Sequence, residues 1–228
     1  DDFFYPPTDL NGSQIIRDDV YHTGPFVSGR YGGPDNMRDA QTANKAVDFL
    51  TNKAGGLDQP FYLGVGISRP HLDWVVPGEF WDMYDQGEIR AALEQSLSDG
   101  TILPAIDEYF DVPPMTRPAT VANTIAQDMD LWTDYIHAYL ASVSYADSKI
   151  GQVLDALEAD PALAADTSIV LWSDNGFHLG DQTRWQKTTP WRTATEVPMV
   201  IVEPHGVGGR PAGSGGNHLD PKPPVRDL

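Results

Sequence analysis

The chain has 228 residues, of which 40% are apolar, and this length and composition are typical of a globular protein with one large domain or two small ones. Its formal net charge of −18 at pH 7 repels nucleic acids and anionic lipid surfaces, so we expect neither nucleic acid nor a membrane as a partner. The sequence contains no cysteine, which excludes disulfides, thiolate ligands and a cysteine nucleophile within it.

The first part of the sequence predicts an irregular segment, one helix and one strand. Residues 1–38 are rich in glycine, proline and asparagine, which indicates turns and irregular chain. Asp39 has the residue type of a helix N-cap, and apolar residues at helical spacing extend to about Lys53. Residues 61–66 (FYLGVG) are apolar on both faces, as expected for a parallel strand that helices cover on each side.

The middle of the sequence predicts a long connection followed by the strongest helix. Residues 67–125 hold many prolines and acidic residues, and we interpret them as a long excursion over the sheet with one short helix near 78–84. From about residue 125 to residue 158, apolar residues recur at steps of three and four, which predicts a long amphipathic helix. We expect this helix to cover one face of the sheet.

Two further strands are predicted at 167–173 and 197–202, and the apolar centre of the first is expected to be buried. Residues 203–228 form a tail rich in glycine and proline. The alternation of helices and strands predicts an α/β fold with a mostly parallel sheet flanked by helices. Because three strands are few for such a fold, we interpret residues 1–228 as part of a single α/β domain that is incomplete.

The loop after the strand at 167–173 carries an unusual set of polar side chains in DNGFHLGDQTRWQK, which starts at Asp174. In open α/β sheets, ligands bind at the carboxyl ends of strands, where this loop begins. Asp174 and Asn175 provide neighbouring carboxylate and amide oxygens, which suit a hard cation such as Ca²⁺ or Mg²⁺, and Gly176 allows a sharp turn after them. The commoner meaning of Asp-Asn-Gly is an Asx turn that reverses the chain, and this alternative stays open.

Two more side chains are candidates for the same site. Lys187 ends this stretch in a setting with two tryptophans, although a lysine in a loop is more often simply solvated. His71 follows the predicted strand at 61–66, which also places it near the carboxyl end of a strand. A lone histidine in such a place is more often a hydrogen-bonded structural residue than a catalyst.

Three segments carry a longer pattern. The stretch TSIVLWSDNGFHLGDQTRWQKTTPWRTATEVPMVIV, which starts at Thr167, has S-D-[HN]-G, a variant of L-G-E, W-x-K and A-T-x-V-P in that order. FYLGVGISRPHLDWVVPGEFWDMYD and YLASVSYADSKIGQVLDALE precede it, and together the three cover about a third of the chain. In order and spacing they resemble the sulfatases of the alkaline phosphatase superfamily, especially the iduronate-2-sulfatase-like branch. The resemblance implies an alkaline phosphatase/sulfatase-like fold.

The resemblance also implies roles for four residues. Asp174 and Asn175 match two metal ligands of the sulfatase site, with Ca²⁺ as the favoured cation and Mg²⁺ as the alternative. Lys187 matches the lysine that contacts the sulfate and its bridging oxygen, and His71 matches the histidine of the family's K-P-H segment, beside the leaving group. These residue types suit sulfate ester cleavage, in which positive groups stabilise negative charge and a histidine protonates the leaving oxygen.

The sequence departs from the family pattern at several positions. Arg69 replaces the lysine of K-P-H, Asp181 replaces the glutamate of L-G-E, and Gln182 replaces the histidine that often follows it. Sulfatases of this kind use a formylglycine made from the first residue of C/S-x-P-x-R, and the nearest match, which starts at Ser68, lacks the final arginine. We therefore expect formylglycine only in a missing N-terminal portion of the same fold, supplied by the same gene or by a separate chain.

These observations predict a sulfuric ester hydrolase that acts on a sulfated sugar, with the isolated chain inactive because it lacks the nucleophile. The alternatives are a phosphatase or phosphonate hydrolase of the same superfamily, and a catalytically silent acidic binding module. His178, Arg184 and Arg192 lie near the matched residues in sequence and are candidates to bind a sugar carboxylate or a second sulfate. Family resemblance and acidity favour a periplasmic or secreted location.

Overall fold

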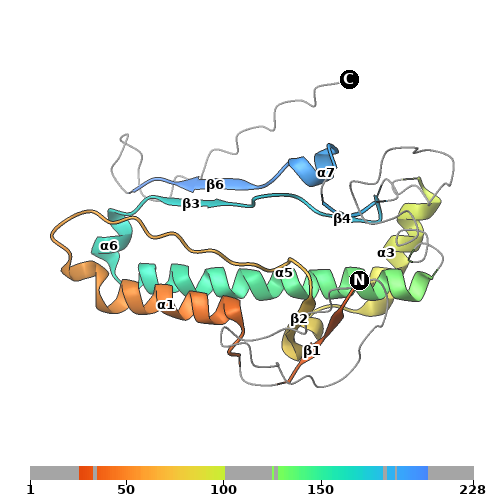
Figure 1. The fold of residues 1–228 in the computed structure, drawn as a ribbon, viewed down its shortest axis with the longest axis horizontal. Helices are drawn as coiled ribbons and strands as arrows, with labels where there is room; N and C mark the ends of the chain where they lie inside the picture. Colours follow the sequence, from red (N-terminus) through yellow and green to blue (C-terminus); the bar gives the residue numbers. More distant parts are fainter. Residues whose placement is uncertain are drawn as a thin grey trace, which may run out of the picture.

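A long helix forms the scaffold of the molecule. The computed structural model describes residues 26–32, 35–100, 125, 128–181, 184–187 and 189–204. Its helices are α1 (Arg38–Asn52), η1 (a 3-10 turn, Ala54–Gly56), α2 (Gly78–Trp81), α3 (Gln86–Ser98), α5 (Met129–Glu158), α6 (Pro161–Ala165) and α7 (Arg192–Thr195). Its strands are β1 (Ser28–Tyr31), β2 (Trp74–Pro77), β3 (Ile169–Trp172), β4 (His178–Leu179), β5 (Trp185–Gln186) and β6 (Met199–Val202). Helix α5 contacts α1, α2, α3, α6, β1 and β2. The β3–β6 pair runs along the side of α5 that is opposite α1 (Figure 1).

The sequence of α5 explains why it takes this central place. Asp128 caps the helix, because its side chain accepts a hydrogen bond of 3.0 Å from the backbone N–H of Leu131. Buried residues then recur at steps of three and four along one stripe, which includes Trp132, Tyr135, Ala138, Ala141 and Tyr145. The helix predicted between about residues 125 and 158 is therefore confirmed. No helix among the described residues is both long enough and apolar enough to cross a bilayer.

The strands form three pairs that only partly match the expected sheet. β1 and β2 pair in parallel, whereas β3 pairs with β6 and β4 pairs with β5 in antiparallel register. The α/β class is confirmed, but the prediction of a mostly parallel sheet is wrong for the described strands. Parallel pairing of β3 and β6 would need a crossover that returns the chain to the start of β3. Instead, β4, β5 and α7 stay at the end of β3, so the chain enters β6 from that end (Figure 1).

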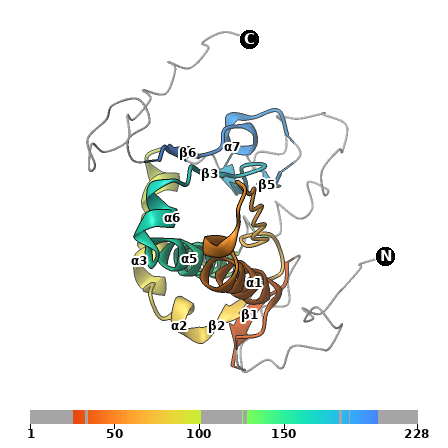
Figure 2. The same cartoon turned by 90° about the vertical axis from the view of Figure 1, so that its left-hand side faces the viewer.

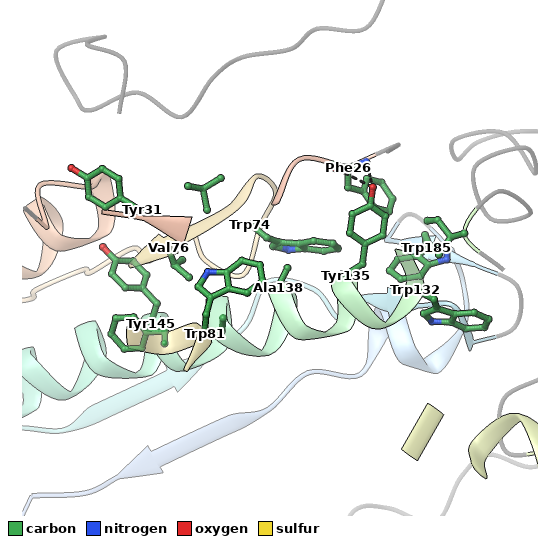
Figure 3. Close-up of a cluster of buried hydrophobic side chains, with 14 of the residues drawn as sticks. Phe26, Tyr31, Trp74, Val76, Trp81, Trp132, Tyr135, Ala138, Tyr145 and Trp185 are labelled. Carbon is green, nitrogen blue, oxygen red and sulfur yellow. Dashed lines mark hydrogen bonds between the residues drawn. The ribbon is translucent and has the colours of Figure 1, made fainter. Parts of the chain in front are cut away.

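An aromatic cluster holds β1, β2 and the hairpin β4–β5 against α5 (Figure 3). The ring of Phe26 lies 5.5 Å from that of Trp74, 5.3 Å from that of Tyr135 and 5.6 Å from that of Trp185. The hydroxyl of Tyr135 donates to the carbonyl of Phe26 and accepts from its N–H, both at 3.0 Å. Burial raises the pKa of Tyr135 to about 12, so the phenol keeps the proton that it donates.

A second apolar cluster lies at the other end of α5. It contains Leu50 and Ala54 with Leu157, and the partly buried Phe61 packs against it. The predicted strand at 61–66 is absent, because these residues do not pair with another described strand and run as extended chain between α5 and β3 (Figure 2). Tyr62 is 88% exposed, so this segment buries one side only rather than the two that were expected.

The strands β3 and β6 lie where the sequence predicted strands, but they are not buried. Val170 and Leu171 are neighbours that point to opposite faces, and they are 44% and 42% exposed. In β6, Met199 is 63% and Ile201 is 56% exposed. The prediction that the apolar centre of β3 is buried is therefore wrong for the described structure, in which only Ile169 of β3 packs against the cluster of Leu50, Ala54 and Leu157.

Two helix predictions also need correction. Helix α1 ends near Lys53 as predicted, but Met37 is its N-cap and Asp39 lies buried inside its first turn. Helix α2 matches the short helix expected near 78–84, whereas α3 falls within the long excursion and was not predicted. Only one residue of α3, Leu93, is buried, so the helix leaves little apolar periodicity in the sequence. The irregular segment predicted for residues 1–38 is wrong where Ser28–Tyr31 form β1. Its part up to residue 25 and the predicted tail from residue 205 lie outside the described residues.

Candidate functional site

The turn after β3 presents two free oxygen-bearing side chains. Asp174 is exposed and Asn175 is half-buried, and neither side chain makes a hydrogen bond or ion pair with another described residue. The backbone N–H of Gly176 donates to the carbonyl of Ala194 at 2.9 Å, rather than to the carboxylate of Asp174 as an Asx turn would require. The Asx turn that was the alternative explanation is therefore not formed.

Gly176 is required here by a close approach of two backbone segments. A Cβ atom on this residue would lie 1.9 Å from the carbonyl oxygen of Thr193, at the start of α7. Any larger residue would push the turn away from α7. The sequence argument assigned Gly176 to a sharp turn, whereas the structure requires a glycine there because of this contact with α7.

Alternate residues of the following loop anchor it to α5. Phe177 packs 5.4 Å from the ring of Tyr139, and the indole N–H of Trp132 donates to the carbonyl of Leu179 at 2.9 Å. Gly180 has a φ of 107°, and a Cβ on it would lie 2.2 Å from the ring of Trp132. The aromatic and glycine positions thus hold the loop against α5.

The second candidate segment, around His71, is held by a buried carboxylate. Asp39 accepts hydrogen bonds of 2.9 Å from the backbone N–H and hydroxyl of Ser68 and from the backbone N–H of Arg69. The indole N–H of Trp74 donates to the carbonyl of Pro70, also at 2.9 Å. Sequence reasoning missed this role of Asp39, because an acid near a helix start has the same signature when it caps the helix.

His71 is exposed at the tip of this turn. Its Nδ1 lies 2.7 Å from the carbonyl oxygen of Leu72, which makes Nδ1 the donor and leaves Nε2 without a partner among the described residues. Arg69, which replaces the family lysine, turns back so that Nη1 lies 3.4 Å from the carbonyl of His71. The guanidinium of Arg69 therefore supports the turn that presents the imidazole.

The structure brings the two segments together through one aromatic contact. The rings of Trp74 and Phe177 lie 5.8 Å apart, with His71 three residues before Trp74 and Asn175 two residues before Phe177. Lys187 directly follows β5, is half-buried, and its ammonium group has no hydrogen bond or ion pair with another described residue. Asp174, Asn175, His71 and Lys187 thus all keep polar atoms free for a ligand.

His178 has a different role from the one predicted. Its side chain is fully buried, with Nδ1 2.8 Å from a carboxylate oxygen of Asp181 and Nε2 2.7 Å from the hydroxyl of Thr189. Both ring nitrogens are therefore occupied within the loop, which contradicts direct substrate binding by His178. Burial alone would raise the pKa of Asp181, but hydrogen bonds from His178 and Thr193 outweigh burial and hold this pKa below its ordinary value.

The two predicted arginines are placed less favourably for a ligand than Lys187. Arg192 forms a bidentate ion pair with Glu196, with Nε–Oε1 and Nη2–Oε2 distances of 2.6 and 2.8 Å, and the pair is exposed. Arg184 lies in the loop, and its backbone N–H donates to the carbonyl of Asp181 at 2.9 Å. Within the described part of the chain, no three histidine, aspartate or glutamate side chains gather as a metal-binding group.

Comparison with known proteins identifies the family. The family model for sulfatases matches residues 4–213. The chain belongs to the sulfatase family. A sulfatase from Formosa agariphila is 34% identical to it over 174 residues, which cover 74% of this chain and 32% of that protein. Iduronate 2-sulfatase of Homo sapiens is 30% identical over 171 residues, which cover 74% of this chain and 31% of that protein.

Solved structures share the fold of this sulfatase chain. A putative sulfatase from Bacteroides fragilis aligns with a TM-score of 0.57 at 18% identity, over 91% of this chain and 42% of that one. The phosphonate monoester hydrolase of Agrobacterium radiobacter aligns with a TM-score of 0.56 at 21% identity, over 86% and 39%. The predicted family and the alkaline phosphatase/sulfatase-like fold are both confirmed. The chain spans about a third of the length of these two curated relatives.

Proposed function

We propose that this sulfatase chain carries one side of the active site of a sulfuric ester hydrolase, and that another segment supplies the nucleophile. The observation that carries the proposal is that four side chains, in two segments that meet at Trp74 and Phe177, each keep polar atoms without a partner among the described residues. Asp174 and Asn175 offer oxygens, whereas Lys187 and His71 offer a positive charge and an imidazole. Neighbouring polar residues such as Asp181 are used to build the loop.

The oxygens of Asp174 and Asn175 fit a divalent cation. Both are hard donors, they are adjacent at a strand end, and neither is committed to another described residue. Ca²⁺ takes six to eight oxygen ligands, so the remaining ligands must come from water, the substrate and another segment. A cation held there would supply Lewis acidity toward the oxygens of the sulfuryl group. Ca²⁺ is the favoured ion, with Mg²⁺ as the alternative.

Lys187 and His71 have separate roles in breaking the bond between sulfur and the ester oxygen. The bond forms between sulfur and the nucleophile of the other segment, and the bonding electron pair leaves with the ester oxygen. The ammonium group of Lys187 stabilises negative charge on the sulfate and on the departing oxygen. His71 gives that oxygen a proton from Nε2, while its Nδ1–H keeps its hydrogen bond to Leu72 and fixes the ring.

The proposal requires a second segment, and the strands β3 and β6 provide a surface for it. Trp172 is 57% exposed, and the four residues of β6 are each at least 47% exposed although all are apolar. An isolated two-stranded sheet with two apolar faces in water is marginally stable at best. We assign the missing N-terminal portion of the sulfatase fold as the partner that covers this sheet and brings the nucleophile, in one polypeptide or as a separate chain.

The substrate that we assign is a sulfate ester on a sugar. This assignment comes from the similarity to iduronate 2-sulfatase and to an N-acetylglucosamine-6-O-sulfatase of Bacteroides thetaiotaomicron, which is 23% identical over 248 residues. Of the residues predicted to bind a sugar carboxylate or a second sulfate, Arg192 and His178 leave the proposal, since Arg192 pairs with Glu196 and both ring nitrogens of His178 are engaged. Because sulfated sugars occur outside cells, we also infer a periplasmic or secreted location. Fractionation of the source cells would test this location.

The isolated 228-residue chain is expected not to hydrolyse p-nitrocatechol sulfate, because a metal ion and a proton donor cannot form the covalent intermediate without a nucleophile. The same chain with a portion that carries C/S-x-P-x-R converted to formylglycine should hydrolyse it, and should prefer sulfated oligosaccharides. Initial rates of product release with added Ca²⁺ measure both. Robust hydrolysis by the isolated chain contradicts the proposal, and a silent complete assembly favours the acidic binding module. Preference for a phosphate diester or phosphonate over the sulfate would assign the activity to the phosphonate hydrolases.

Replacing Asp174 by alanine is expected to weaken Ca²⁺ binding to the complete assembly by roughly tenfold or more, because the cation loses one of its charged ligands. Isothermal calorimetry measures the change in the dissociation constant. Asp147→Ala is the matched control, since Asp147 is an exposed carboxylate on α5. Equal Ca²⁺ affinity in Asp174→Ala and Asp147→Ala would remove Asp174 from the cation site.

A further inference from the structure

We infer that His178 is a positioning residue that fixes the backbone on both sides of Lys187. The inference rests on the proposed role of Lys187 at the sulfate, and it assigns a purpose to a buried histidine that the reaction itself does not use. His178 is fully buried and has both ring nitrogens engaged, so its effect must pass through the residues that it holds.

On the amino-terminal side, Lys187 is held by the hairpin β4–β5. His178 pairs in antiparallel register with Gln186, the residue immediately before Lys187, and Leu179 pairs with Trp185. Gln186 has a φ of 71°, in the left-handed region that residues other than glycine seldom adopt. Such a conformation persists when the surrounding structure enforces it, and it is found at sites where a side chain must point in one direction. Here it turns the chain at the point where Lys187 leaves the hairpin.

On the carboxyl-terminal side of Lys187, the side chain of His178 holds Thr189. The hydroxyl of Thr189, two residues after Lys187, lies 2.7 Å from Nε2 of His178. Because the ring is buried, this hydrogen bond is shielded from competition by water. The backbone pairing of His178 therefore holds Gln186, and its side chain holds Thr189, on the two sides of Lys187.

Asp181 sets the orientation of the imidazole. A carboxylate can only accept, so Nδ1 of His178 donates to Asp181, and Nε2 is left to pair with the hydroxyl of Thr189. Asp181 is itself fixed by the backbone N–H of Leu179 at 3.2 Å and by the hydroxyl of Thr193 at 2.9 Å. The depressed pKa of Asp181 is consistent with a carboxylate that remains charged in this network.

The network also joins Lys187 to the turn that carries the oxygen ligands. Thr193 donates to Asp181, and the next residue, Ala194, accepts from the backbone N–H of Gly176, beside Asn175. A continuous series of hydrogen bonds therefore runs from Gly176 through α7 and Asp181 to His178 and Thr189. A donor that is held before the substrate arrives needs no reorganisation during the reaction, so we expect this fixed geometry to appear in kcat.

The experiment replaces Thr189, because it is half-buried and its loss does not empty the core. Thr189→Val keeps the shape and removes the hydroxyl, whereas Thr189→Ser keeps the hydroxyl. Thr195→Val is the matched control, since Thr195 is exposed on α7 and, within the described part of the chain, its hydroxyl donates to the carbonyl of Trp191 alone. Each variant is measured in the 228-residue chain by the backbone ¹⁵N order parameter of Lys187, and in the complete assembly by kcat and KM for a sulfate ester.

For Thr189→Val we expect the order parameter of Lys187 to fall from about 0.85 to below about 0.6. We also expect kcat to fall by roughly tenfold with KM changed by less than about twofold. Thr189→Ser and Thr195→Val should match the wild type in both measurements. A rigid Lys187 in Thr189→Val overturns the inference, and so does a mobile Lys187 with unchanged kcat. If the wild-type assembly has an ordered Lys187 but no hydrolysis, the proposed function fails. A lower order parameter of Lys187 in Thr189→Val would then show that His178 and Thr189 serve the structure of the loop only.

Discussion

Replacing Gly180 by alanine is expected to lower the melting temperature of the chain by roughly 6 to 12 °C. Gly180 has a φ of 107°, where an alanine is strained, and its new Cβ would lie 2.2 Å from the indole of Trp132. Strained backbone and overpacking each cost about 1–3 kcal/mol, so the free energy of unfolding should fall by about 3 kcal/mol. The hydrogen bond from Trp132 to the carbonyl of Leu179 should be lost as the hairpin moves away from α5. Thermal melts followed by circular dichroism measure the change.

Gly151→Ala is the matched control, because it makes the same chemical change in the interior of α5. A Cβ at Gly151 meets no other atom within 4 Å, and alanine is the better helix former by about 1 kcal/mol. Its melting temperature should therefore rise by a few degrees. Equal melting temperatures for Gly180→Ala and the wild type would mean that the hairpin does not rest on Trp132.

The sequence was sufficient to predict the elements whose signals are local and strong. Helix α5 combines a capping aspartate with a long apolar stripe, and the strands β3 and β6 are short apolar runs between turn residues, so each was placed within a few residues. The pairing of β3 with β6 was harder to predict. Whether the two strands run in parallel depends on where residues 173–198 pack, and this follows from contacts with α5 that no local pattern records.

The candidate site shows the same division between local and non-local information. Asp174, Asn175, Lys187 and His71 were identified from residue type, strand ends and family resemblance, and each keeps polar atoms that no other described residue bonds. His178 could not be separated from them, because a histidine that binds a ligand and one that holds a loop have the same residue type and similar spacing. The difference lies in burial and in the hydrogen bonds to Asp181 and Thr189, which only the folded chain contains.

The exposed strands β3 and β6 also show that an apolar pattern can correctly predict a strand although the burial that it implies is not observed. The apolar residues of β3 and β6 predict burial on two faces, whereas Val170 and Leu171, which point to opposite faces, are 44% and 42% exposed. Burial depends on the rest of a fold of which this chain covers 42% or less in the two aligned structures. The segment 61–66 follows the same rule, since it has the composition of a strand but no described strand beside it.

Replacing Lys187 or His71 by alanine in the complete assembly is expected to reduce turnover of a sulfated sugar by roughly a hundredfold or more in each case. The Lys187→Ala change would remove a positive charge beside the sulfate, and the His71→Ala change would remove the proton donor for the leaving oxygen. Melting temperatures should stay close to that of the wild type, because His71 is exposed and the ammonium group of Lys187 has no described partner to lose. Steady-state kinetics and thermal melts must be measured on the same preparations.

The choice of substrate separates the two roles. An ester with a good leaving group, such as p-nitrocatechol sulfate, needs little protonation of the departing oxygen, so His71→Ala should recover much of its activity on it relative to a sulfated sugar. Lys187→Ala should stay impaired on both substrates, because charge on the sulfuryl oxygens must be stabilised in either case. Lys45→Ala, an exposed lysine on α1, is the matched control and should match the wild type. A variant that loses its melting transition while its folded fraction turns over normally would show that the residue serves the fold. Equal recovery of both variants on the aryl ester would assign both residues to the leaving oxygen and leave the charge on sulfate to other groups.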